Sequence, residues 1–492
     1  MPTYSKAPDC PPGLVGDVAK FILEQAPRPV PEIALVGALA FVAGIAGRQY
    51  NVSATGLNSY FMLIAPTGTG KEAVAQGISK LVEAVASGPN GAPAIRNFIG
   101  PGEIRSDAAL LKLLPNQKCF LSIMGEVGML IKRMSGPRAS PNDLGILRVW
   151  LDLWGKSGRG NVLNPMVYSD AAKSTDVVAS PAFTMLGEST PEGFYEALDE
   201  TMVASGLLPR FHIIEYSGDR PDLNEGASYA RPTSELITAV KQLVVEVNHL
   251  AELKQVSDVG FTEDASNEFR TFNAYCDDNI RGSRETSRQV WNRAHLKAMK
   301  LAAIIAVGIS HKAPVIDLWV AKWATQLVDD DARNIIGRFE RGEIGDIAGN
   351  ELLQQDRVRA VMRECIERPF AEILKQYGGD KAEERREQLS KLHAAGLVTH
   401  QYLQRRLLNL KLFSGGPNKP SNANMALKRA IERLAENAEI GVASPHITKR
   451  FCGFNYLAYG FAEYDPNNLF EQSKSNVFFD NASADEIRGK MK

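Results

Sequence analysis

Short apolar runs alternate with helix-like stretches through the middle of the chain. Apolar residues in segments such as 143–154 and 191–203 follow the spacing of a helix. Fully apolar strands that alternate with helices are typical of a parallel sheet covered on both faces. The pattern therefore predicts an α/β core over residues 50–216. The four runs with the length of buried strands are 58–64, 118–124, 182–186 and 211–215.

Two helices are expected before this core, separated by a Pro-rich stretch at residues 26–31. The second, Ile33–Ala46, is apolar on nearly every side, which predicts a buried helix. Its apolar run is shorter than the about 20 residues that a membrane span needs, so we expect no membrane partner.

The chain after the core changes in composition twice. Residues 217–232 have the Gly, Pro and Asp content of a linker, and residues 233–340 have mostly helical patterns. The predicted domains are an N-terminal helical segment (1–49), the core (50–216), a linker with a helical domain (217–347), a basic domain (348–463) and a flexible polar tail (464–492).

Composition narrows the class of protein. The formal net charge of the 492 residues is -1, so any nucleic-acid surface has to be a local patch. The five cysteines are scattered without CxxC spacing, which disfavours a zinc site or a disulfide framework and is typical of a reducing compartment. No signal peptide is recognisable at the N-terminus, so we expect a cytoplasmic protein.

A Gly-rich segment follows the first strand of the core, and a helix is expected from Lys71 to Ser87. Strand, loop and helix in this order, with a Gly-x-Gly-Lys centre, indicate a phosphate-binding P-loop. Glycines let backbone N–H groups turn toward phosphates, and the helix dipole favours the same anion. The residues predicted to bind ATP are Pro66, Thr67, Gly68, Thr69, Gly70, Lys71 and Glu72.

Two positions depart from the usual P-loop pattern. Ala65 replaces its first glycine, and Glu72 replaces the Ser or Thr whose hydroxyl contacts Mg²⁺. We expect Glu72 either to ligate Mg²⁺ through its carboxylate or to weaken nucleotide binding through its negative charge.

The strand at 118–124 ends in Gly125-Glu126. In P-loop enzymes an Asp-Glu pair at this place organises Mg²⁺ and polarises the attacking water. Glu126 is therefore the predicted catalytic base. Gly125 stands at the position of the missing Asp, and we expect Glu72 to compensate for it.

Two further positions are candidates. Ser189 or Thr190 either contacts the γ-phosphate or caps a helix that begins at Pro191. Arg210 begins a strand soon after Gly206, where an arginine can reach the site of a neighbouring subunit and stabilise the transferring phosphate. A surface ion pair is the alternative for Arg210.

These motifs, in this order, resemble the primase-helicase ATPases of phages and mobile elements, a RecA-like family. The resemblance extends from Pro12 to about residue 440 and includes segments 187–192, 206–211 and 292–295. It implies a RecA-like fold with ATP and Mg²⁺, a ring that we expect to be hexameric, and DNA-linked hydrolysis. The implied function is a helicase or translocase of phage or mobile-element replication, without a primase, in the cytoplasm of a bacterial host.

The resemblance also implies partners and competing functions. Single-stranded or forked DNA, further copies of the chain and other replication proteins are the implied partners. A nucleotide-binding helicase loader or scaffold with weak hydrolysis is the main alternative, and a DNA-binding regulator is a third.

The basic region 391–430 contains no Asp or Glu. Thr399 is expected to cap a basic helix, as in a winged-helix or helix-turn-helix module, while a protein-docking helix is the alternative. Loops 132–138 and 155–160 of the core are expected either to follow a DNA backbone or to be plain surface loops. The predicted DNA-binding residues are Lys156, Arg159, Arg405, Arg406 and Lys411.

Overall fold

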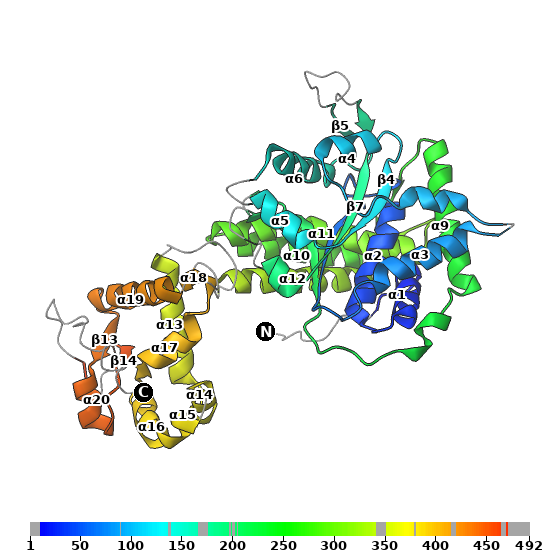
Figure 1. Ribbon diagram of the computed structural model, residues 1–492. Coiled ribbons are helices and arrows are strands. Elements are labelled where there is room, and N and C mark those ends of the chain that lie inside the picture. The colour runs from blue at the N-terminus through cyan, green and yellow to red at the C-terminus, as the bar shows by residue number, and fades with distance from the viewer. Residues whose placement is uncertain are drawn as a thin grey trace. The chain divides into compact units, whose positions relative to one another are not determined.

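The protein is represented by a computed structural model, which forms two compact units, Met1–Gly337 and Arg338–Lys492 (Figure 1). Unit 1 contains the N-terminal helices, the predicted core and most of the helical segment that follows it. The residues that the structure describes are 10–88, 90–135, 139–165, 176–195, 198, 202–203, 205–340, 351–377, 380–414, 420–463 and 469–470.

Four parallel strands form the central sheet of unit 1, in the order β4-β7-β3-β8. This confirms the α/β class and the four predicted strands. Beyond β4, Ile99 forms a single parallel bridge with Leu121. Because all four strands run in the same direction, their carboxyl ends meet at one edge of the sheet. Their bounds are β3 (Tyr60–Ile64), β4 (Cys119–Met124), β7 (Ala182–Ser189) and β8 (Phe211–Glu215).

Helix α2 (Pro31–Ala46) lies directly against one face of this sheet and contacts all four strands (Figure 1). Its residues from Ile33 to Ala46 are all buried, as the sequence predicted. Helices α1 (Leu14–Gln25) and α3 (Ala73–Ala86) pack against α2. A search of the described helices found no segment with the length and hydrophobicity of a membrane span.

Helices α5 (Val127–Ser135) and α6 (Pro141–Leu153) pack against each other and also contact the sheet. The Tyr60 hydroxyl donates a hydrogen bond to the carbonyl of Trp150, at 2.7 Å, and so ties β3 to α6. The smaller elements of this part of unit 1 are η1 (Pro93–Phe98), α4 (Asp107–Leu113), β5 (Val162–Leu163), β6 (Val178–Ala179), α7 (Pro191–Tyr195) and η3 (Leu208–Arg210).

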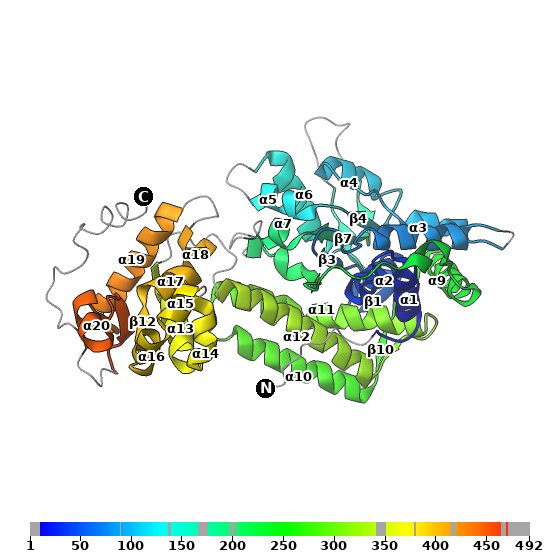
Figure 2. The same ribbon diagram turned by 60° about the horizontal axis from the view of Figure 1, so that its bottom comes forward.

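The rest of unit 1 is mainly helical (Figure 2). The predicted linker contains a short 3-10 helix, and the helices after it confirm the helical pattern predicted for residues 233–340. The elements are η4 (Glu225–Tyr229), α9 (Ser234–Glu252), α10 (Glu263–Ile280), α11 (Glu285–Ile309) and α12 (Leu318–Glu340). Strand β9 (Ser257–Asp258) pairs with β1 (Tyr50–Val52), which also pairs with β2 (Thr55–Gly56), and so joins this part to the core. Strands β10 (Gly260–Phe261) and β11 (Val315–Ile316) pair with each other within it.

Unit 2 has its own apolar core and a small antiparallel sheet in the order β12-β14-β13. The Thr399 hydroxyl accepts a hydrogen bond from the backbone N–H of Tyr402, at 3.2 Å, which confirms Thr399 as the cap of α17. Its helices are α13 (Glu351–Glu367), α14 (Phe370–Tyr377), α15 (Asp380–Glu384), α16 (Arg386–Ala394), α17 (His400–Leu407), α18 (Lys411–Ser414), α19 (Pro420–Glu436) and α20 (Pro445–Cys452). Its strands are β12 (Val398–Thr399), β13 (Ile440–Ala443) and β14 (Ala458–Phe461).

The close packing of α2 on the sheet leads to a prediction. A Cβ atom at Gly44 would lie 2.6 Å from the Cβ of Leu121 in β4. Gly44→Val should therefore lower the free energy of unfolding by roughly 1 to 3 kcal/mol, measured by urea denaturation. Gly102→Val is the matched control, because a Cβ there would meet only the Ile123 carbonyl, at 3.6 Å. Equal stability of the two variants would contradict the close packing.

Candidate phosphate-binding site

The segment Ala65–Glu72 leaves β3 at the carboxyl edge of the sheet and leads into α3. Gly68 and Gly70 have φ angles of 80° and 90°, in the left-handed region that favours glycine. A Cβ atom at Gly70 would also lie 2.7 Å from the carbonyl oxygen of Arg28. The loop conformation thus depends on these two glycines.

Backbone donors line this loop. The N–H groups from Thr67 to Glu72 donate no hydrogen bond to any described residue. The Thr69 hydroxyl donates to the Pro66 carbonyl at 2.8 Å and holds the turn, while the Lys71 ammonium donates to the Ala65 carbonyl at 2.6 Å. The positive end of the α3 dipole adds to these donors. The loop therefore suits an oxyanion such as phosphate.

Two arginines that the sequence did not reveal lie beside the loop. Arg28, in the connection between α1 and α2, packs against Gly70, and its guanidinium donates to the Pro221 carbonyl at 2.8 Å. Arg220 follows β8, and its Nε lies 3.8 Å from the position of a Cβ on Gly68. Arg28 lies in the Pro-rich stretch 26–31 and Arg220 in the predicted linker 217–232, so no local sequence pattern indicated a role for either.

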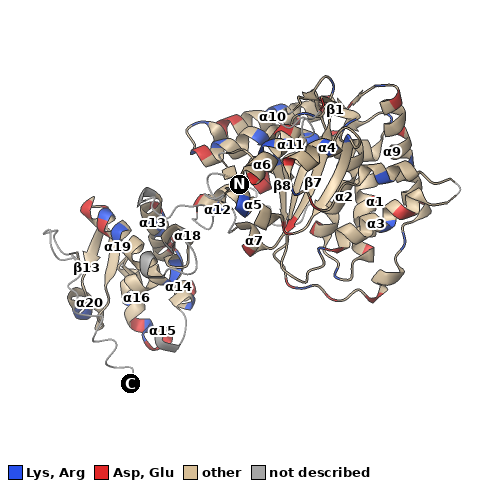
Figure 3. Cartoon of the chain, turned by 45° about the horizontal axis from the view of Figure 1, so that its top comes forward, with Lys and Arg blue, Asp and Glu red and all other residues tan. Residues whose placement is uncertain are grey.

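Acidic side chains face the loop from neighbouring strands, and Figure 3 shows red positions where these strands end. Burial raises the pKa of Glu188, near the end of β7, to about 7. The charges of Glu72 and Glu126 contribute to this rise in pKa, and that of Lys71 opposes it. The structure therefore brings the predicted residues Lys71, Glu72 and Glu126 together and adds Glu188, which the sequence analysis missed.

Strand register explains the place of Glu188. Met124 pairs with Gly187, so Glu188 is level with Gly125, where an Asp was expected. Glu188 Oε1 is buried without a hydrogen-bond partner among the described residues. The neighbouring strand thus supplies a carboxylate close to the position where β4 lacks one.

Glu126 itself is exposed at the turn after β4 and has a φ of 52°. Such a conformation is strained for a residue with a side chain and is concentrated at functional sites. Strand β7 separates β3 from β4, so Glu126 follows a strand that lies two spacings, about 10 Å, from the one that carries the loop. Glu188 of β7 lies between the loop and Glu126 in this order of strands.

The two polar residues after β7 differ in role. The Thr190 hydroxyl accepts a hydrogen bond from the Gly193 N–H at 3.1 Å, so Thr190 caps α7. The Ser189 hydroxyl is buried and has no partner in the described part of the chain, while the Ser189 carbonyl accepts from the Ala65 N–H at 3.2 Å. Of the two, Ser189 is the one joined to the loop.

Arg210 lies at the opposite edge of the sheet. It precedes β8, whose first residue pairs with Tyr60 at the start of β3. Its guanidinium stacks on Trp154, with 5.6 Å between its central carbon and the ring centroid. Arg210 is therefore too far from the phosphate loop of its own chain to contact a ligand there.

The loop at 155–160 is fixed to the core. The Ser157 hydroxyl donates to the Gly47 carbonyl at 2.7 Å, and Arg159 forms an ion pair with Asp258 at 3.0 Å. Lys156 is partly buried in the same loop. In the other predicted loop, residues 132–135 are the last turn of helix α5, so the expectation of a loop there was wrong, and residues 136–138 lie outside the described residues.

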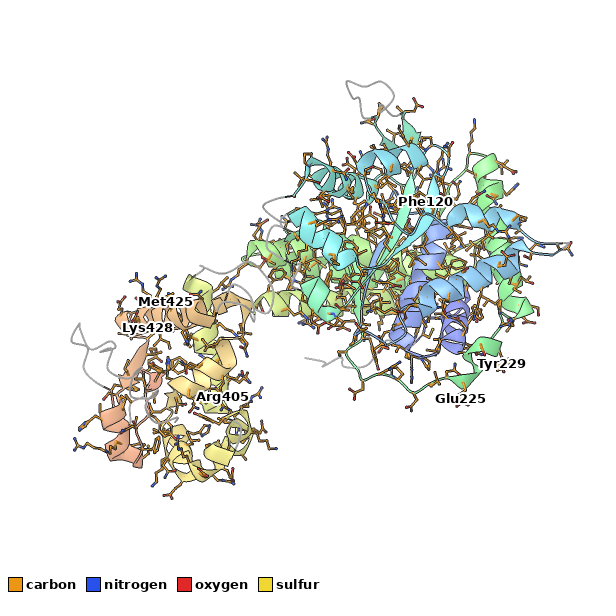
Figure 4. The ribbon with its side chains drawn as sticks, in the orientation of Figure 1. Phe120, Glu225, Tyr229, Arg405, Met425 and Lys428 are labelled. Atoms are coloured by element: carbon orange, nitrogen blue, oxygen red, sulfur yellow. The ribbon has the colours of Figure 1, made fainter. Side chains whose placement is uncertain are left out.

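In unit 2, Arg406 is held by Glu364 of α13, with 2.9 Å between the charged atoms. This acid lies outside the basic window of the sequence, which is why the pairing was not expected. Arg405 is exposed on α17, and Met425 and Lys428 lie on α19 (Figure 4). The side chain of Lys411 is not among those described. Arg406 thus contributes to packing within unit 2.

Comparison with known proteins does not assign the chain to a family. No protein-family model and no curated protein matches the chain. The functional argument therefore depends on the site itself.

The raised pKa of Glu188 predicts a pH dependence of stability. Between the ordinary value of 4.5 and about 7, the folded state holds a proton that the unfolded state releases. The contribution of Glu188 to stability should therefore fall by up to about 3 kcal/mol as pH rises through this range.

Urea denaturation at pH 5 and pH 8 checks this. Glu188→Gln should reduce the difference between the free energies of unfolding at the two pH values. Glu192→Gln, at an exposed position on α7, should leave that difference unchanged. The same pH dependence in all three proteins would show that the Glu188 carboxyl is not buried among these charges.

Proposed function

We propose that unit 1 is a RecA-like P-loop ATPase that drives movement on DNA. The observation that carries the proposal is the loop with Lys71, whose N–H groups donate to no described residue, together with Glu126 and Glu188 at the same edge of a parallel sheet. Donors and a cation for a phosphate chain thus lie across from carboxylates that can act on water or a metal ion.

In this proposal, the N–H groups from Thr67 to Glu72 hold the phosphate oxygens, and the α3 dipole stabilises their charge. Lys71 turns from the Ala65 carbonyl to the β- and γ-phosphates. Arg28 and Arg220 add positive charge from the two sides of the loop. Together these groups neutralise much of the charge of a nucleoside triphosphate.

The residues present also fit Mg²⁺. The orphaned Oε1 of Glu188 is a ligand without a partner among the described residues, and Glu72 is close enough to influence its charge. No group of three metal-ligating side chains was found in the described chain. That suits Mg²⁺, which binds one or two carboxylates and completes its shell with phosphate and water. When bound, the ion would neutralise charge that develops on the phosphates.

Glu126 takes the role of the base. Its carboxylate accepts a proton from a water molecule as that water attacks the γ-phosphate, and the nucleoside diphosphate leaves in line. The strained backbone at Glu126 holds the carboxylate at the turn after β4. Glu188, between Glu126 and the loop, holds the metal rather than the water.

DNA contact and ring assembly extend the proposal. In this proposal α17 and α19 of unit 2 act as the two helices of a helix-turn-helix, although the short α18 lies between them in sequence, and α19 carries Lys428 and Arg429. We assign the DNA-facing surface to α19 together with Arg405 of α17. Since Arg210 cannot reach its own phosphate loop, any catalytic role for it requires a second subunit in a ring.

One observation favours the alternative of a helicase loader or scaffold. Three carboxylates converge on the phosphate loop, and no hydroxyl occupies position 72. Excess negative charge near phosphate weakens binding and slows hydrolysis. Such a protein would bind nucleotide and DNA but turn over slowly.

Removal of the Lys71 charge tests nucleotide binding. Lys71→Ala should weaken binding of ATP with Mg²⁺ by about tenfold to a hundredfold, as expected for loss of a charged hydrogen bond, measured by calorimetric titration. Lys112→Ala, at an exposed position on α4, is the control and should bind as the unaltered protein does. Equal affinity in both variants would reject the loop as the nucleotide site.

Steady-state ATP hydrolysis, with and without single-stranded DNA, separates motor from loader. The motor predicts turnover that DNA stimulates, and a loss of at least about a hundredfold in Glu126→Gln with nucleotide binding retained. DNA stimulation that survives unchanged in Glu126→Gln would contradict the assigned base. Slow turnover in the unaltered protein, without stimulation by DNA, would favour the loader.

A further inference from the structure

Three cationic side chains surround one indole ring near the amino edge of the central sheet. Trp154, just after α6, is 3% exposed. The distances to its ring centroid are 5.6 Å from Arg210, 5.7 Å from Arg293 and 4.5 Å from Lys300. Lys300 is fully buried, while the two arginines are partly exposed. The Trp154 cluster, defined by these four residues, therefore has a protein side and a solvent side.

On the protein side the cluster is well bonded. The Lys300 ammonium donates to the Asn58 carbonyl at 2.8 Å, the Asn58 side-chain oxygen at 3.2 Å and the Trp154 carbonyl at 3.1 Å. This cation belongs to the core and holds α11 to the start of β3 and the end of α6. The Lys300 ammonium is thus fixed in place on the buried side of the cluster, which we call its floor.

Two donors of the cluster lack acceptors. Arg210 Nη1 donates to the Gly206 carbonyl, but Arg210 Nε is buried without a partner among the described residues. The indole Nε1 of Trp154 is likewise buried without a hydrogen-bond partner among the described residues. Buried donors are nearly always paired in folded proteins, because an unpaired one loses its bond to water. Two adjoining groups of the cluster thus hold donors for which the described residues supply no acceptor.

The positive charge of the Trp154 cluster also suggests an anionic ligand. Within the described residues, no carboxylate forms an ion pair with Arg210, Arg293 or Lys300. Asp152 acts on Arg210 from an exposed position, and buried Asp331 is paired with Lys297 at 2.7 Å. Burial and the charge of Arg293 lower the pKa of Arg210 to about 10. Among the described residues, the cluster thus holds positive charge to which no carboxylate is directly paired.

We propose that the Trp154 cluster is a phosphate-binding site, with Arg210 and Arg293 as the ligand-binding side chains and Lys300 as its floor. A phosphate group offers several acceptor oxygens to planar guanidinium donors and carries the charge that the cluster lacks. The indole attracts both guanidinium groups through its ring face, and both arginines remain partly exposed.

This site is distinct from the phosphate loop. The strand β3 has 5 residues, with the cluster near its first and the loop after its last. At about 3.3 Å per residue, the two lie roughly 13 Å or more apart. A phosphate held by Arg210 and Arg293 therefore belongs to another molecule, either a nucleic-acid strand or a nucleotide bound to a second copy of the chain.

Thermal unfolding of the full chain in inorganic phosphate tests the site. The measurement uses Lys71→Ala as background, so that the phosphate loop contributes little and the result does not depend on the proposed ATPase. Phosphate should raise Tm relative to chloride of equal ionic strength. Adding Arg293→Gln should abolish this rise without lowering Tm in chloride, since it relieves repulsion from Arg210.

Arg288→Gln is the matched control, because it removes an arginine from the exposed part of the same helix, where it pairs with Glu285. The control should keep the full phosphate effect. The proposal is overturned if phosphate and chloride give the same Tm in the background protein. It is also overturned if Arg293→Gln and Arg288→Gln respond to phosphate equally.

Two further arms identify the source of the phosphate. If it is a nucleic-acid strand, Arg293→Gln should weaken binding of a single-stranded oligonucleotide about tenfold and reduce the slope of log K against log salt by about 0.7. The other source is a nucleotide on a second copy, which rests on the proposed function and is tested with Lys71 intact. In that case Arg293→Gln should leave oligonucleotide binding unchanged and abolish the assembly that an ATP analogue induces.

Discussion

The parallel pairing of β4, β7, β3 and β8 is the constraint on which the rest of unit 1 depends. Because these strands share one direction, whatever follows them in sequence gathers at one edge, and whatever precedes them gathers at the other. The phosphate loop, Glu188 and Glu126 meet for this reason, although they are separated by long stretches of chain. The same rule places Arg210 at the far edge, beside Trp154.

Charge is distributed unevenly between these two edges. At the carboxyl edge, carboxylates of Glu72, Glu126 and Glu188 lie close to a loop of backbone donors, which is the arrangement that the proposed Mg²⁺ and phosphate chain would complement. At the amino edge, cations gather around Trp154 without a paired anion in the described structure. Both arrangements are costly for an isolated chain, because buried charges need partners. Each becomes favourable when a ligand of the right charge is present.

The sequence predicted what local patterns determine. The strand at 58–64, the Gly-rich loop and the buried helix Ile33–Ala46 each have a signal within a few residues, and all are present. Glu188 was missed because its importance comes from register with β4, not from its neighbours in sequence. Arg28 and the Glu364 partner of Arg406 were missed for the same reason. Contacts between distant segments depend on the fold, which a single sequence shows only indirectly.

The central claim is that the loop at the carboxyl edge holds a nucleoside triphosphate between its N–H groups and the acidic strand ends. A structure of the full chain with Mg²⁺ and a non-hydrolysable ATP analogue tests it most directly. The account predicts phosphates within hydrogen-bond distance of the N–H groups from Thr67 to Glu72. It also predicts Lys71 at the terminal phosphate and Glu126 opposite it. Saturating analogue bound elsewhere, with the loop still empty, would contradict the account.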